Sequence, residues 1–451
     1  MNERNCDVVI IGAGTAGLKA YKAAVARGGD VVIVERGAGG STCTRVGCMP
    51  SKLLLAAGRV AHQARNAAEF GIITGPVVVD AGKLWERVRR ERDRFVASVL
   101  EEYHAIPAYC VVHGSARFDG PDAIVAGEMR ITAAKGIIVA TGGHPIIPEP
   151  LGPVGHLVHT HETIFELDGL PKAMGVLGAG PLGLELAQAF ARLGVDMTVI
   201  DDSDMIGGLH DPTTNKAAIE ALSKDMTLVL GVEASATLDE DGRAHLGWPG
   251  GSVTVNCILA ATGRPPALEG LDLESTGLTL DDHGTPLFDQ ATRRCGDSNI
   301  FLAGDATAWR PVLHEAARGG RVAGEVAMGG GAAKPLPAFA VAFTEPNLVE
   351  VGAPFDALPE DAQLGEAAVA DNGRAAADGD HFGIVRLYAD VDGMLLGASI
   401  VSPDGEHLGH LVALAIEQGM DVTAFEDQAW YHPTLEELLQ TAARDMLRSK
   451  R

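Results

Sequence analysis

Long hydrophobic runs, a basic excess and a secretion signal are all missing from this sequence of 451 residues. No run reaches the roughly 18 apolar residues that a membrane-spanning helix needs, so we expect no membrane span. Acidic residues outnumber basic ones by 60 to 36, and the net charge of −24 disfavours nucleic acid or an anionic membrane as a partner. Because the first residues also lack the basic, apolar and small-residue regions of a signal peptide, we expect a cytoplasmic protein.

Cysteine is scarce as well. Six cysteines in a chain of this length do not make the disulfide framework that is typical of small secreted domains. Four of them lie in or beside apolar segments, and we interpret them as buried small hydrophobic residues: Cys6, Cys110, Cys257 and Cys295. No group of cysteines and histidines has the spacing of a zinc site, so we predict no metal centre. The remaining pair, Cys43 and Cys48, is the candidate for redox chemistry.

Glycine is abundant, with 56 residues, and one glycine loop stands near the start of the chain. An apolar strand expected over residues 7–11 leads into Gly12-Ala13-Gly14-Thr15-Ala16-Gly17, and a helix is expected over 18–27. In this context G-x-G-x-x-G lets the backbone approach a pyrophosphate at the amino terminus of the helix. A second strand, 31–34, ends at Glu35, where a carboxylate accepts hydrogen bonds from ribose hydroxyls.

The same unit returns in the middle of the chain. A strand over residues 174–177 precedes Gly178-Ala179-Gly180-Pro181-Leu182-Gly183, a helix is expected over 184–193, and a strand over 197–200 ends at Asp201. Two dinucleotide folds imply two bound dinucleotides; the alternative is a duplicated fold whose second copy binds nothing. Acidic residues rather than arginines follow this aspartate, which predicts a preference for NAD over NADP.

Strand-end turns predict where the chain leaves each nucleotide sheet. They are Thr141-Gly142 and Thr262-Gly263, so domain borders are expected near residues 145 and 265. The whole chain is too long for one core and suggests two to four domains. A glycine-rich junction over residues 329–335 precedes a compact α+β domain, in which residues 371–380 are expected to form a loop.

The two remaining cysteines lie in the segment Gly39-Gly40-Ser41-Thr42-Cys43-Thr44-Arg45-Val46-Gly47-Cys48-Met49-Pro50-Ser51-Lys52. We expect a loop that feeds a helix and places the two sulfurs on neighbouring turns, with Cα atoms about 6 Å apart, within disulfide range. A helix amino terminus with Arg45 and Lys52 nearby lowers a thiol pKa. By itself, a pair of cysteines at this spacing is also compatible with two ordinary reduced thiols.

Near the carboxyl terminus stands Trp430-Tyr431-His432-Pro433-Thr434-Leu435-Glu436-Glu437. Because His432 precedes a proline, we expect it outside the helix that Pro433 or Thr434 begins. Glu437 is close enough in sequence to accept the ring N–H and so fix the tautomer and orientation of the imidazole.

Taken together, these motifs resemble the FAD-dependent pyridine nucleotide–disulfide oxidoreductases, particularly dihydrolipoyl dehydrogenases, over essentially the whole chain. The resemblance implies an α/β fold with two Rossmann-like dinucleotide-binding domains and an α+β carboxyl-terminal dimerisation domain. The implied borders are residues 1–145 and 265–333 for the FAD domain, 146–264 for the NAD domain and 334–451 for the dimerisation domain.

The resemblance also implies catalytic roles. Cys48 is the thiolate against the flavin, and Cys43 exchanges with the dithiol or disulfide substrate. His432, supported by Glu437, is the acid–base catalyst and reaches the cysteines of the other subunit, which implies a homodimer. Lys52 and Glu185 match the family's lysine–glutamate pair beside the flavin ring, where such a pair stabilises developing negative charge.

Implied cofactor-binding residues occupy both nucleotide domains. In the FAD domain they are Gly12, Gly14, Ala16, Gly17, Glu35, Lys52, Gly114, Thr141, Gly142, Asp305 and His314, with Asp305 binding the ribityl chain. In the NAD domain they are Gly178, Gly180, Pro181, Leu182, Gly183, Glu185, Asp201 and Gly263.

We therefore expect a dihydrolipoyl dehydrogenase-like enzyme that uses FAD and NAD, with a lipoyl group as substrate, free or on a lipoyl-bearing protein of a multienzyme complex. The alternatives are a glutathione reductase-like enzyme and a flavin-bearing redox subunit with little turnover of its own. Mercuric and large thioredoxin reductases carry an extra carboxyl-terminal redox pair, whereas this sequence ends Arg448-Ser449-Lys450-Arg451. Two departures from the family pattern stand out: Pro181 at the nicotinamide loop, and Thr44-Arg45 in place of the common Leu-Asn between the cysteines.

Overall fold

A computed structural model describes residues 2–449. The chain divides into two compact units. Unit 1 comprises residues 1–50, 88–146 and 263–335, and unit 2 comprises residues 51–87, 147–262 and 336–451. Residues 51–87 thus cluster with unit 2, although the sequence placed them within an uninterrupted first domain. The assignment of cofactors to domains stays a prediction.

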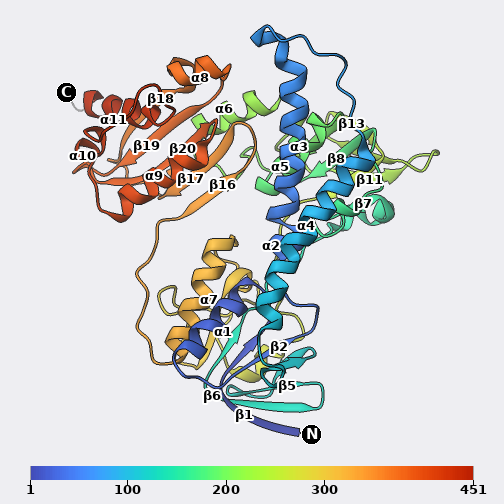
Figure 1. The fold of residues 1–451 in the computed structure, drawn as a ribbon, viewed down its shortest axis with the longest axis vertical. Helices are drawn as coiled ribbons and strands as arrows, with labels where there is room; N and C mark the ends of the chain where they lie inside the picture. Colours follow the sequence, from blue (N-terminus) through green and yellow to red (C-terminus); the bar gives the residue numbers. More distant parts are fainter. Residues whose placement is uncertain (1, 450–451) are drawn as a thin grey trace. The chain divides into compact units, whose positions relative to one another are not determined.

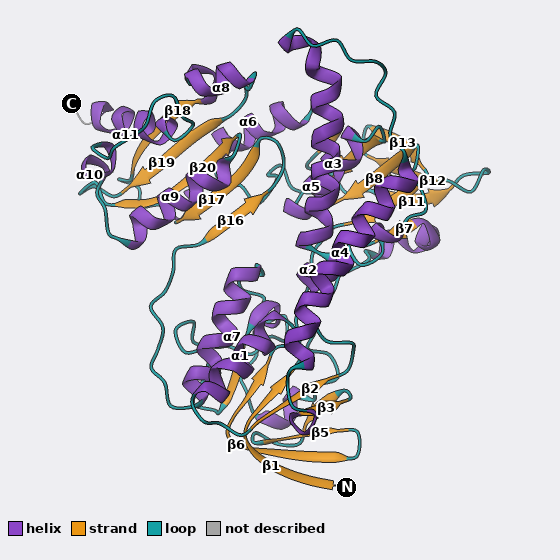
Figure 2. Cartoon of the chain, in the orientation of Figure 1, coloured by secondary structure: helices purple, strands orange, loops and turns teal. Residues whose placement is uncertain are grey.

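Unit 1 is built on a mixed sheet (Figures 1 and 2). Its strands run in the order β3-β2-β1-β6-β5-β4, and β15 also pairs with β6. The parallel strands are apolar on both sides: Val8 and Ile10 belong to one core, and Val9 and Ile11 to the core on the opposite face. Such continuous apolar strands are typical of a parallel sheet that is covered on both faces. The strands are β1 (Asn2–Ile11), β2 (Val31–Glu35), β3 (Val111–His113), β4 (Ala116–Phe118), β5 (Ala123–Ala126), β6 (Met129–Val139) and β15 (Ile300–Leu302).

Helices α1 (Thr15–Ala26) and α7 (Leu313–Ala327) lie side by side in unit 1 (Figure 1). Two glycines of α7 permit this close approach. A Cβ at Gly320 would lie 2.0 Å from the carbonyl oxygen of Ala16, and one at Gly324 would lie 2.4 Å from that of Ala20. The packing fixes the helix that follows the first glycine loop. The other helices with residues in unit 1 are α2 (Thr42–Val46), α3 (Cys48–Asn66) and α4 (Ala81–His104), of which α3 and α4 continue into unit 2.

Unit 2 contains the second nucleotide fold. A parallel sheet has the strand order β10-β9-β8-β14-β7, and three antiparallel strands, β11-β12-β13, form a separate small sheet. The chain leaves β13 near Val255 and enters the parallel sheet as β14, so these two consecutive strands belong to different sheets. The elements are β7 (Val158–His159), β8 (Ala173–Leu177), α5 (Pro181–Arg192), β9 (Asp196–Ile200), α6 (Pro212–Leu222), β10 (Thr227–Val229), β11 (Ser235–Leu238), β12 (Ala244–Trp248), β13 (Gly251–Val255) and β14 (Cys257–Ala260).

The carboxyl-terminal part of unit 2 is an antiparallel sheet in the order β16-β17-β20-β19-β18, packed with helices into one apolar core. Its elements are β16 (Phe339–Ala342), β17 (Asn347–Gly352), β18 (Gln363–Ala368), α8 (Gly373–Asp378), β19 (Ile384–Ala389), β20 (Leu395–Ser402), α9 (Gly405–Glu417), α10 (Val422–Glu426) and α11 (Glu437–Ser449). The loop expected over residues 371–380 is wrong. Asn372 caps α8 by accepting from the N–H groups of Arg374 and Ala375, and Arg374 pairs with Asp378 one turn later.

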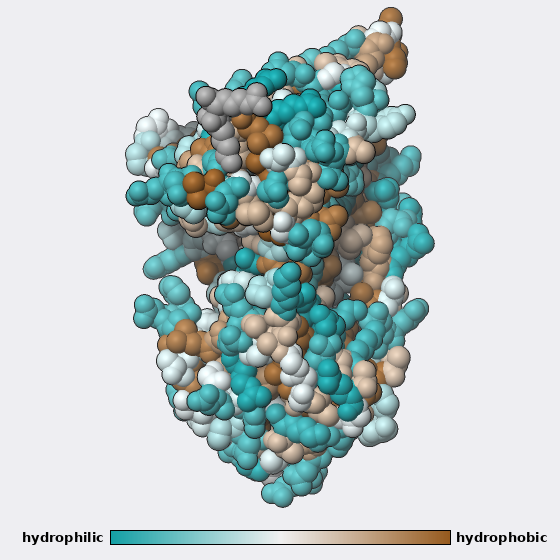
Figure 3. Space-filling view, turned by 90° about the vertical axis from the view of Figure 1, so that its left-hand side faces the viewer, coloured by the Kyte–Doolittle hydropathy of each residue, from teal (hydrophilic) through white to brown (hydrophobic). Residues whose placement is uncertain are grey.

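Within residues 2–449, no helix is both long and apolar enough to cross a membrane. The same residues contain no cluster of three His, Cys, Asp or Glu side chains arranged for a metal ion. The face drawn in Figure 3 is largely hydrophilic, with apolar residues in small scattered patches. The prediction that four cysteines are buried is confirmed, and burial raises the pKa of Cys6, Cys257 and Cys295 to about 12, which makes these thiols poor nucleophiles.

Candidate functional site: two nucleotide loops, a cysteine pair and a histidine

The first glycine loop connects β1 to α1 in unit 1. Gly12 has a φ of +105°, and a Cβ there would lie 2.4 Å from the carbonyl oxygen of Ala140. A Cβ at Gly17 would lie 1.9 Å from the carbonyl oxygen of Gly12. Both positions therefore require glycine, because the loop is pressed between the ends of β1, β6 and α1.

Glu35, at the end of β2, closes this loop from the side. One carboxylate oxygen accepts from the N–H of Ala13 at 2.6 Å, and the other accepts from Gly37 at 2.7 Å. The N–H of Gly114, just after β3, donates to the carbonyl oxygen of Glu35 at 3.0 Å. Each carboxylate oxygen keeps acceptor capacity for a ribose hydroxyl. The structure thus brings Gly12, Glu35 and Gly114 to one edge of the sheet.

Other predicted residues of unit 1 lie at the ends of β6 and β15. The hydroxyl oxygen of Thr141 is buried and has no hydrogen-bond partner within residues 2–449. Gly142 follows with a φ of +77°. Asp305, in the short helical turn Gly304–Thr307, lies 3.0 Å from the guanidinium of Arg264. Arg264 thus contacts Asp305, the residue predicted to bind the ribityl chain of FAD. No role was predicted for Arg264 from the sequence.

Three further predicted residues have different surroundings. Ala16 is buried where α1 packs against α7, so its surroundings are those of a helix–helix contact. His314 is exposed in the first turn of α7. Gly263 clusters with unit 1, and its carbonyl oxygen accepts from Ile146 at 3.4 Å, whereas the second glycine loop belongs to unit 2.

The two cysteines of the segment lie in unit 1, on two separate helices. Cys43 lies in α2 and is half-buried, while Cys48 is exposed and begins α3. The single helix predicted through both residues is interrupted at Gly47, which has non-helical φ and ψ of −124° and −118°. A Cβ at Gly47 would lie 3.2 Å from the Cα atom of Cys43, so the backbone folds back closely between the two cysteines.

Ser41 anchors this segment to the first nucleotide loop. Its hydroxyl lies 2.8 Å from that of Thr15 and accepts from the N–H of Cys43 at 3.2 Å, so it also caps α2. Arg45, the departure noted between the cysteines, donates to the carbonyl oxygen of Gly39 at 2.9 Å. The guanidinium therefore ties α2 back to the glycine pair that precedes it.

The second loop, between β8 and α5, repeats the first in detail. Gly178 has a φ of +105°, and its Cβ would lie 2.4 Å from the carbonyl oxygen of Ala261. A Cβ at Gly183 would lie 2.0 Å from the carbonyl oxygen of Gly178. Asp201, at the end of β9, accepts from the N–H of Ala179, as Glu35 does from Ala13 in unit 1. Pro181, the departure noted in this loop, is the exposed first residue of α5, and Leu182 follows half-buried.

Both loops fit a dinucleotide diphosphate. Gly14 and Gly180 stand at the amino termini of α1 and α5, and no side chain among residues 2–449 caps either helix. A Cβ at Gly180 would meet open space, and one at Gly14 would meet only the carbonyl oxygen of Gly40, at 3.9 Å. The first-turn N–H groups and the positive end of each helix dipole are therefore left for phosphate oxygens.

Lys52 and Glu185 form a close ion pair in unit 2. The ammonium nitrogen lies 2.7 Å from one carboxylate oxygen of Glu185, whose side chain is 5% exposed. Lys52 stands on α3 four residues after Cys48, which is one helical turn. The family resemblance implied that these two residues form a pair, and the structure brings them together.

His432 and Glu437 are also in contact, within the carboxyl-terminal part of unit 2. Nδ1 of His432 lies 3.1 Å from both carboxylate oxygens of Glu437. Glu437 also accepts from the N–H of Thr434 at 3.1 Å, and this bond is the first cause that lowers its pKa, ahead of the bond from His432. α11 begins at Glu437 rather than at Pro433 or Thr434, and the carboxylate of this first residue turns back to the N–H of Thr434. The imidazole is 79% exposed and therefore available to a partner.

Two glycine loops of matching geometry, each between a parallel strand of its own sheet and the helix that follows, define a protein that binds two dinucleotides. Residues 6–320 match the family model of the pyridine nucleotide-disulphide oxidoreductases, and residues 338–443 match the dimerisation domain of the same family. The chain belongs to this family and is an enzyme of the FAD- and NAD(P)-binding class I type.

Named relatives cover almost the whole chain. A dihydrolipoyl dehydrogenase of Haloferax volcanii is 31% identical over 98% of this chain and 96% of its own length. A mercuric reductase of Acidithiobacillus ferrooxidans is 32% identical over 98% of this chain and 82% of its own length. The structure of LpdA from Mycobacterium tuberculosis shares the fold with a TM-score of 0.84 at 24% identity, over 98% of this chain and 99% of that one. The HOCl-induced flavoprotein disulfide reductase RclA of Escherichia coli, as the Cu(II) complex of its C43S mutant, has a TM-score of 0.83 at 22% identity, with both chains fully covered.

Proposed function

We propose that the protein is a dihydrolipoyl dehydrogenase-like enzyme that oxidises a dithiol and reduces NAD. The observation that carries the proposal is the cysteine segment, which Ser41 anchors to the first nucleotide loop through the hydroxyl of Thr15. A cysteine pair held beside a flavin-binding loop is the arrangement that dithiol exchange requires. The dihydrolipoyl dehydrogenases of Haloferax volcanii and Halobacterium salinarum give further support, because the matches to them cover 98% of this chain at 31% and 32% identity.

In the proposed reaction, a substrate thiolate attacks the sulfur of Cys43 in the Cys43–Cys48 disulfide. A mixed disulfide forms, and Cys48 leaves as a thiolate. The second substrate thiol then attacks the mixed disulfide, which releases the oxidised substrate and leaves both cysteines reduced. His432 takes the thiol protons as general base, and Glu437 orients its ring. FAD, which Gly12, Gly14, Gly17, Glu35 and Asp305 would hold, would supply the two-electron chemistry that links the reduced cysteine pair to NAD.

Cofactor contacts follow the two loops. We assign the FAD diphosphate to Gly12, Gly14 and Gly17, its adenosine ribose to Glu35, and its ribityl chain to Asp305. In the second domain we assign the NAD diphosphate to Gly178, Gly180 and Gly183. These assignments draw support from the uncapped helix termini and from the carboxylates that stand beside each loop.

The Lys52–Glu185 pair is assigned to the flavin ring, where the ammonium would stabilise negative charge on the reduced cofactor. Support comes from its place one helical turn after Cys48. A homodimer completes the proposal: the dimerisation-domain match extends over residues 338–443, which include the exposed His432. We propose a lipoyl group as the substrate and a cytoplasmic location.

The test measures turnover of the purified holoenzyme in separate assays. One assay supplies NAD and dihydrolipoamide, and a second supplies NADPH and glutathione disulfide. A third replaces dihydrolipoamide with a set of lipoyl-bearing proteins. We expect NADH formation from dihydrolipoamide and little oxidation of NADPH by glutathione disulfide. The reverse ranking would favour a glutathione reductase-like enzyme. Bound FAD with negligible turnover in every arm would favour a redox subunit without activity of its own.

Mercuric ion belongs in the same experiment, because the mercuric reductases in the comparison are as similar in sequence as the dihydrolipoyl dehydrogenases. Hg(II)-dependent oxidation of a reduced nicotinamide, faster than disulfide reduction, would overturn the proposed substrate. Cys43 and Cys48 are the two cysteines of the described residues that are not buried, so they are the thiolate ligands to test for the ion.

A further inference from the structure

Helix α5 carries a stripe of three buried polar side chains. Glu185, Gln188 and Arg192 are spaced three and four residues apart, so they share one face of the helix. They are 4%, 0% and 8% exposed. Buried polar groups are costly unless they are hydrogen-bonded, so the partners of this stripe show what it is built to hold.

All three side chains bind the same short segment, the turn between β16 and β17. Glu185 accepts from the N–H of Phe343 at 2.9 Å. Gln188 accepts from the N–H of Glu345 at 2.8 Å and donates to its carbonyl oxygen at 2.8 Å. Arg192 forms an ion pair with the carboxylate of Glu345. The backbone of residues 343–345 is therefore held along α5 at three successive points.

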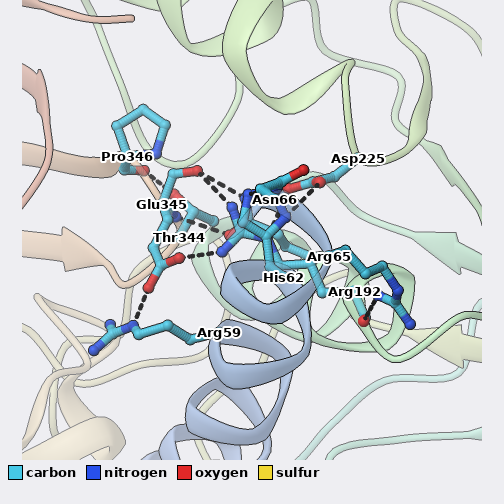
Figure 4. Close-up of polar contacts among 10 residues, drawn as sticks. Arg59, His62, Arg65, Asn66, Arg192, Asp225, Thr344, Glu345 and Pro346 are labelled. Atoms are coloured by element: carbon cyan, nitrogen blue, oxygen red, sulfur yellow. Dashed lines mark hydrogen bonds and ion pairs between the residues drawn. The ribbon is translucent and has the colours of Figure 1, made fainter. Parts of the chain in front are cut away.

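The outer end of the stripe is a cluster of charged side chains around the buried Arg192 (Figure 4). The guanidinium of Arg192 lies 2.9 Å from Asp225 as well as against Glu345, and Arg59 of α3 pairs with Glu345 from the other side. α3 and α5 are in close contact here, because a Cβ at Gly58 would lie 3.1 Å from the carbonyl oxygen of Ala189. This cluster fixes the turn relative to both α5 and α3.

The inner end of the stripe meets Lys52, also on α3. The Lys52 ammonium lies 2.7 Å from one oxygen of Glu185, while the other oxygen of Glu185 accepts from Phe343. The same ammonium lies 4.3 Å from the centroid of the Phe343 ring. Phe343 thus contacts both members of the pair, one through its backbone and the other through its ring.

We propose that Phe343 is a positioning residue for the Lys52–Glu185 pair. Its N–H fixes the Glu185 carboxylate, and the negative face of its ring holds the Lys52 ammonium in one place. The inference rests on the proposed function, because the pair matters for electron transfer only if it lies beside the flavin. A lysine side chain without the ring would sample more rotamers and would stabilise the reduced flavin less.

The chain offers a matched control. Phe382 is half-buried, belongs to the same unit, and its ring centroid lies 2.9 Å from the ammonium of Lys224. Phe382→Leu therefore removes a similar cation–ring contact that touches neither Lys52 nor Glu185. Phe343→Leu keeps the backbone N–H and removes only the ring, while Phe343→Tyr keeps a ring that presents the same negative face.

The experiment measures the midpoint potential and visible spectrum of bound FAD in the holoenzyme, for the wild type and each variant. We expect Phe343→Leu to move the potential to more negative values, with a change of about two- to five-fold in the equilibrium constant for flavin reduction. Phe343→Tyr should restore the wild-type value, and Phe382→Leu should not alter it. Phe343→Met, an unbranched replacement that fills gaps well, gives the same comparison if the leucine variant does not fold.

Lys52→Met separates this inference from the function on which it rests. A shift in Lys52→Met without one in Phe343→Leu and Phe343→Met would overturn the role of Phe343 and leave the pair beside the flavin. No shift in Lys52→Met would show that the pair does not act on the flavin, and it would overturn both statements. Equal shifts in Phe343→Leu and Phe382→Leu would also overturn the inference, because the effect would then be general.

Discussion

Both carboxylate oxygens of Glu437 lie 3.1 Å from Nδ1 of His432. This contact leaves Nε2 as the nitrogen that exchanges protons with a substrate thiol. We predict that His432→Gln slows dithiol oxidation by at least about 100-fold, the usual contribution of a positioned general base. Glu437→Gln should slow dithiol oxidation less than His432→Gln does, since the amide oxygen still accepts the ring N–H. Stopped-flow reduction by dihydrolipoamide measures both rates, and an unaffected rate in His432→Gln would remove the histidine from the mechanism.

The subunit arrangement can be tested with the same variant. If each site combines the cysteines of one subunit with the histidine of the other, a heterodimer of Cys43→Ser and His432→Gln subunits keeps one intact site. Mixing and exchanging the two inactive proteins should then restore part of the activity. Without any recovery in heterodimers of verified composition, the site would have to be complete within one chain.

The two cysteines should be separable by their readouts. Cys43→Ser is expected to abolish disulfide exchange while FAD stays bound and reducible by NADH, because in the proposed reaction Cys43 is the cysteine that exchanges with the substrate. Cys48→Ser should also eliminate the long-wavelength absorption that a thiolate against the flavin produces. Titration with NADH under anaerobic conditions, followed by absorbance, measures both effects. Normal dihydrolipoamide turnover by Cys43→Ser would contradict the assignment.

How far the sequence predicts this site depends on whether the contacts are local. Gly12 and Gly178 were predicted from their loops, since the close approach of the backbone to a neighbouring strand end is encoded by the glycines themselves. The contact between His432 and Glu437 was also predictable, because only a turn separates them. The break at Gly47 was not, since glycine within a helical pattern does not by itself show whether the helix continues.

Long-range partners could not be read from local patterns in the sequence, and Lys52 and Glu185 were paired only through the family resemblance. Phe343 reaches Glu185 from 158 positions away, and no local pattern signals that contact. The sequence nevertheless contains one indication of such contacts, because Gln188 and Arg192 are polar residues on the face of α5 that contains Glu185. Polar positions on a buried helix face indicate that partners exist, but only the fold identifies them.

The buried carboxyl group of Glu350 predicts how the stability of the folded protein changes with pH. Burial is the largest cause that raises its pKa, from 4.5 to about 7, and Asp211 adds to this, while hydrogen bonds from Ser399 and from the N–H of His210 oppose it. An acid with a raised pKa in the folded state keeps its proton when the unfolded chain has lost it. Its contribution to stability is therefore largest below pH 4.5 and declines as the pH rises to about 7, by up to about 3 kcal/mol.

Glu350→Gln should remove this decline, so the variant should gain stability relative to the wild type between pH 5 and pH 8. Denaturant unfolding of the holoenzyme at both values measures the difference, and the exposed Glu360→Gln serves as the matched control. A stability difference between wild type and Glu350→Gln that stays constant with pH would show that the buried carboxyl does not titrate in this range.

The choice of nicotinamide rests on Asp201. Its two carboxylate oxygens accept from the N–H groups of Ala179 and of Ser203, the latter at 2.8 Å, so the charge is fixed at the end of β9. The 2′-phosphate of NADP would meet this carboxylate, and the neighbouring Asp202 and Asp204 are exposed and also acidic. We therefore predict a preference for NAD(H) of about 2 kcal/mol or more, the scale of one unfavourable contact to a hydrogen-bonded charge.

Asp201→Ala should reduce that preference by improving the use of NADP(H) and weakening the use of NAD(H). Asp202→Ala, which removes the exposed carboxylate next to it, should change the ratio less. The measurement is kcat/KM for both cofactors in each variant. Equal values for NADH and NADPH in the native protein would contradict this role of Asp201. They would favour a disulfide reductase that uses NADPH.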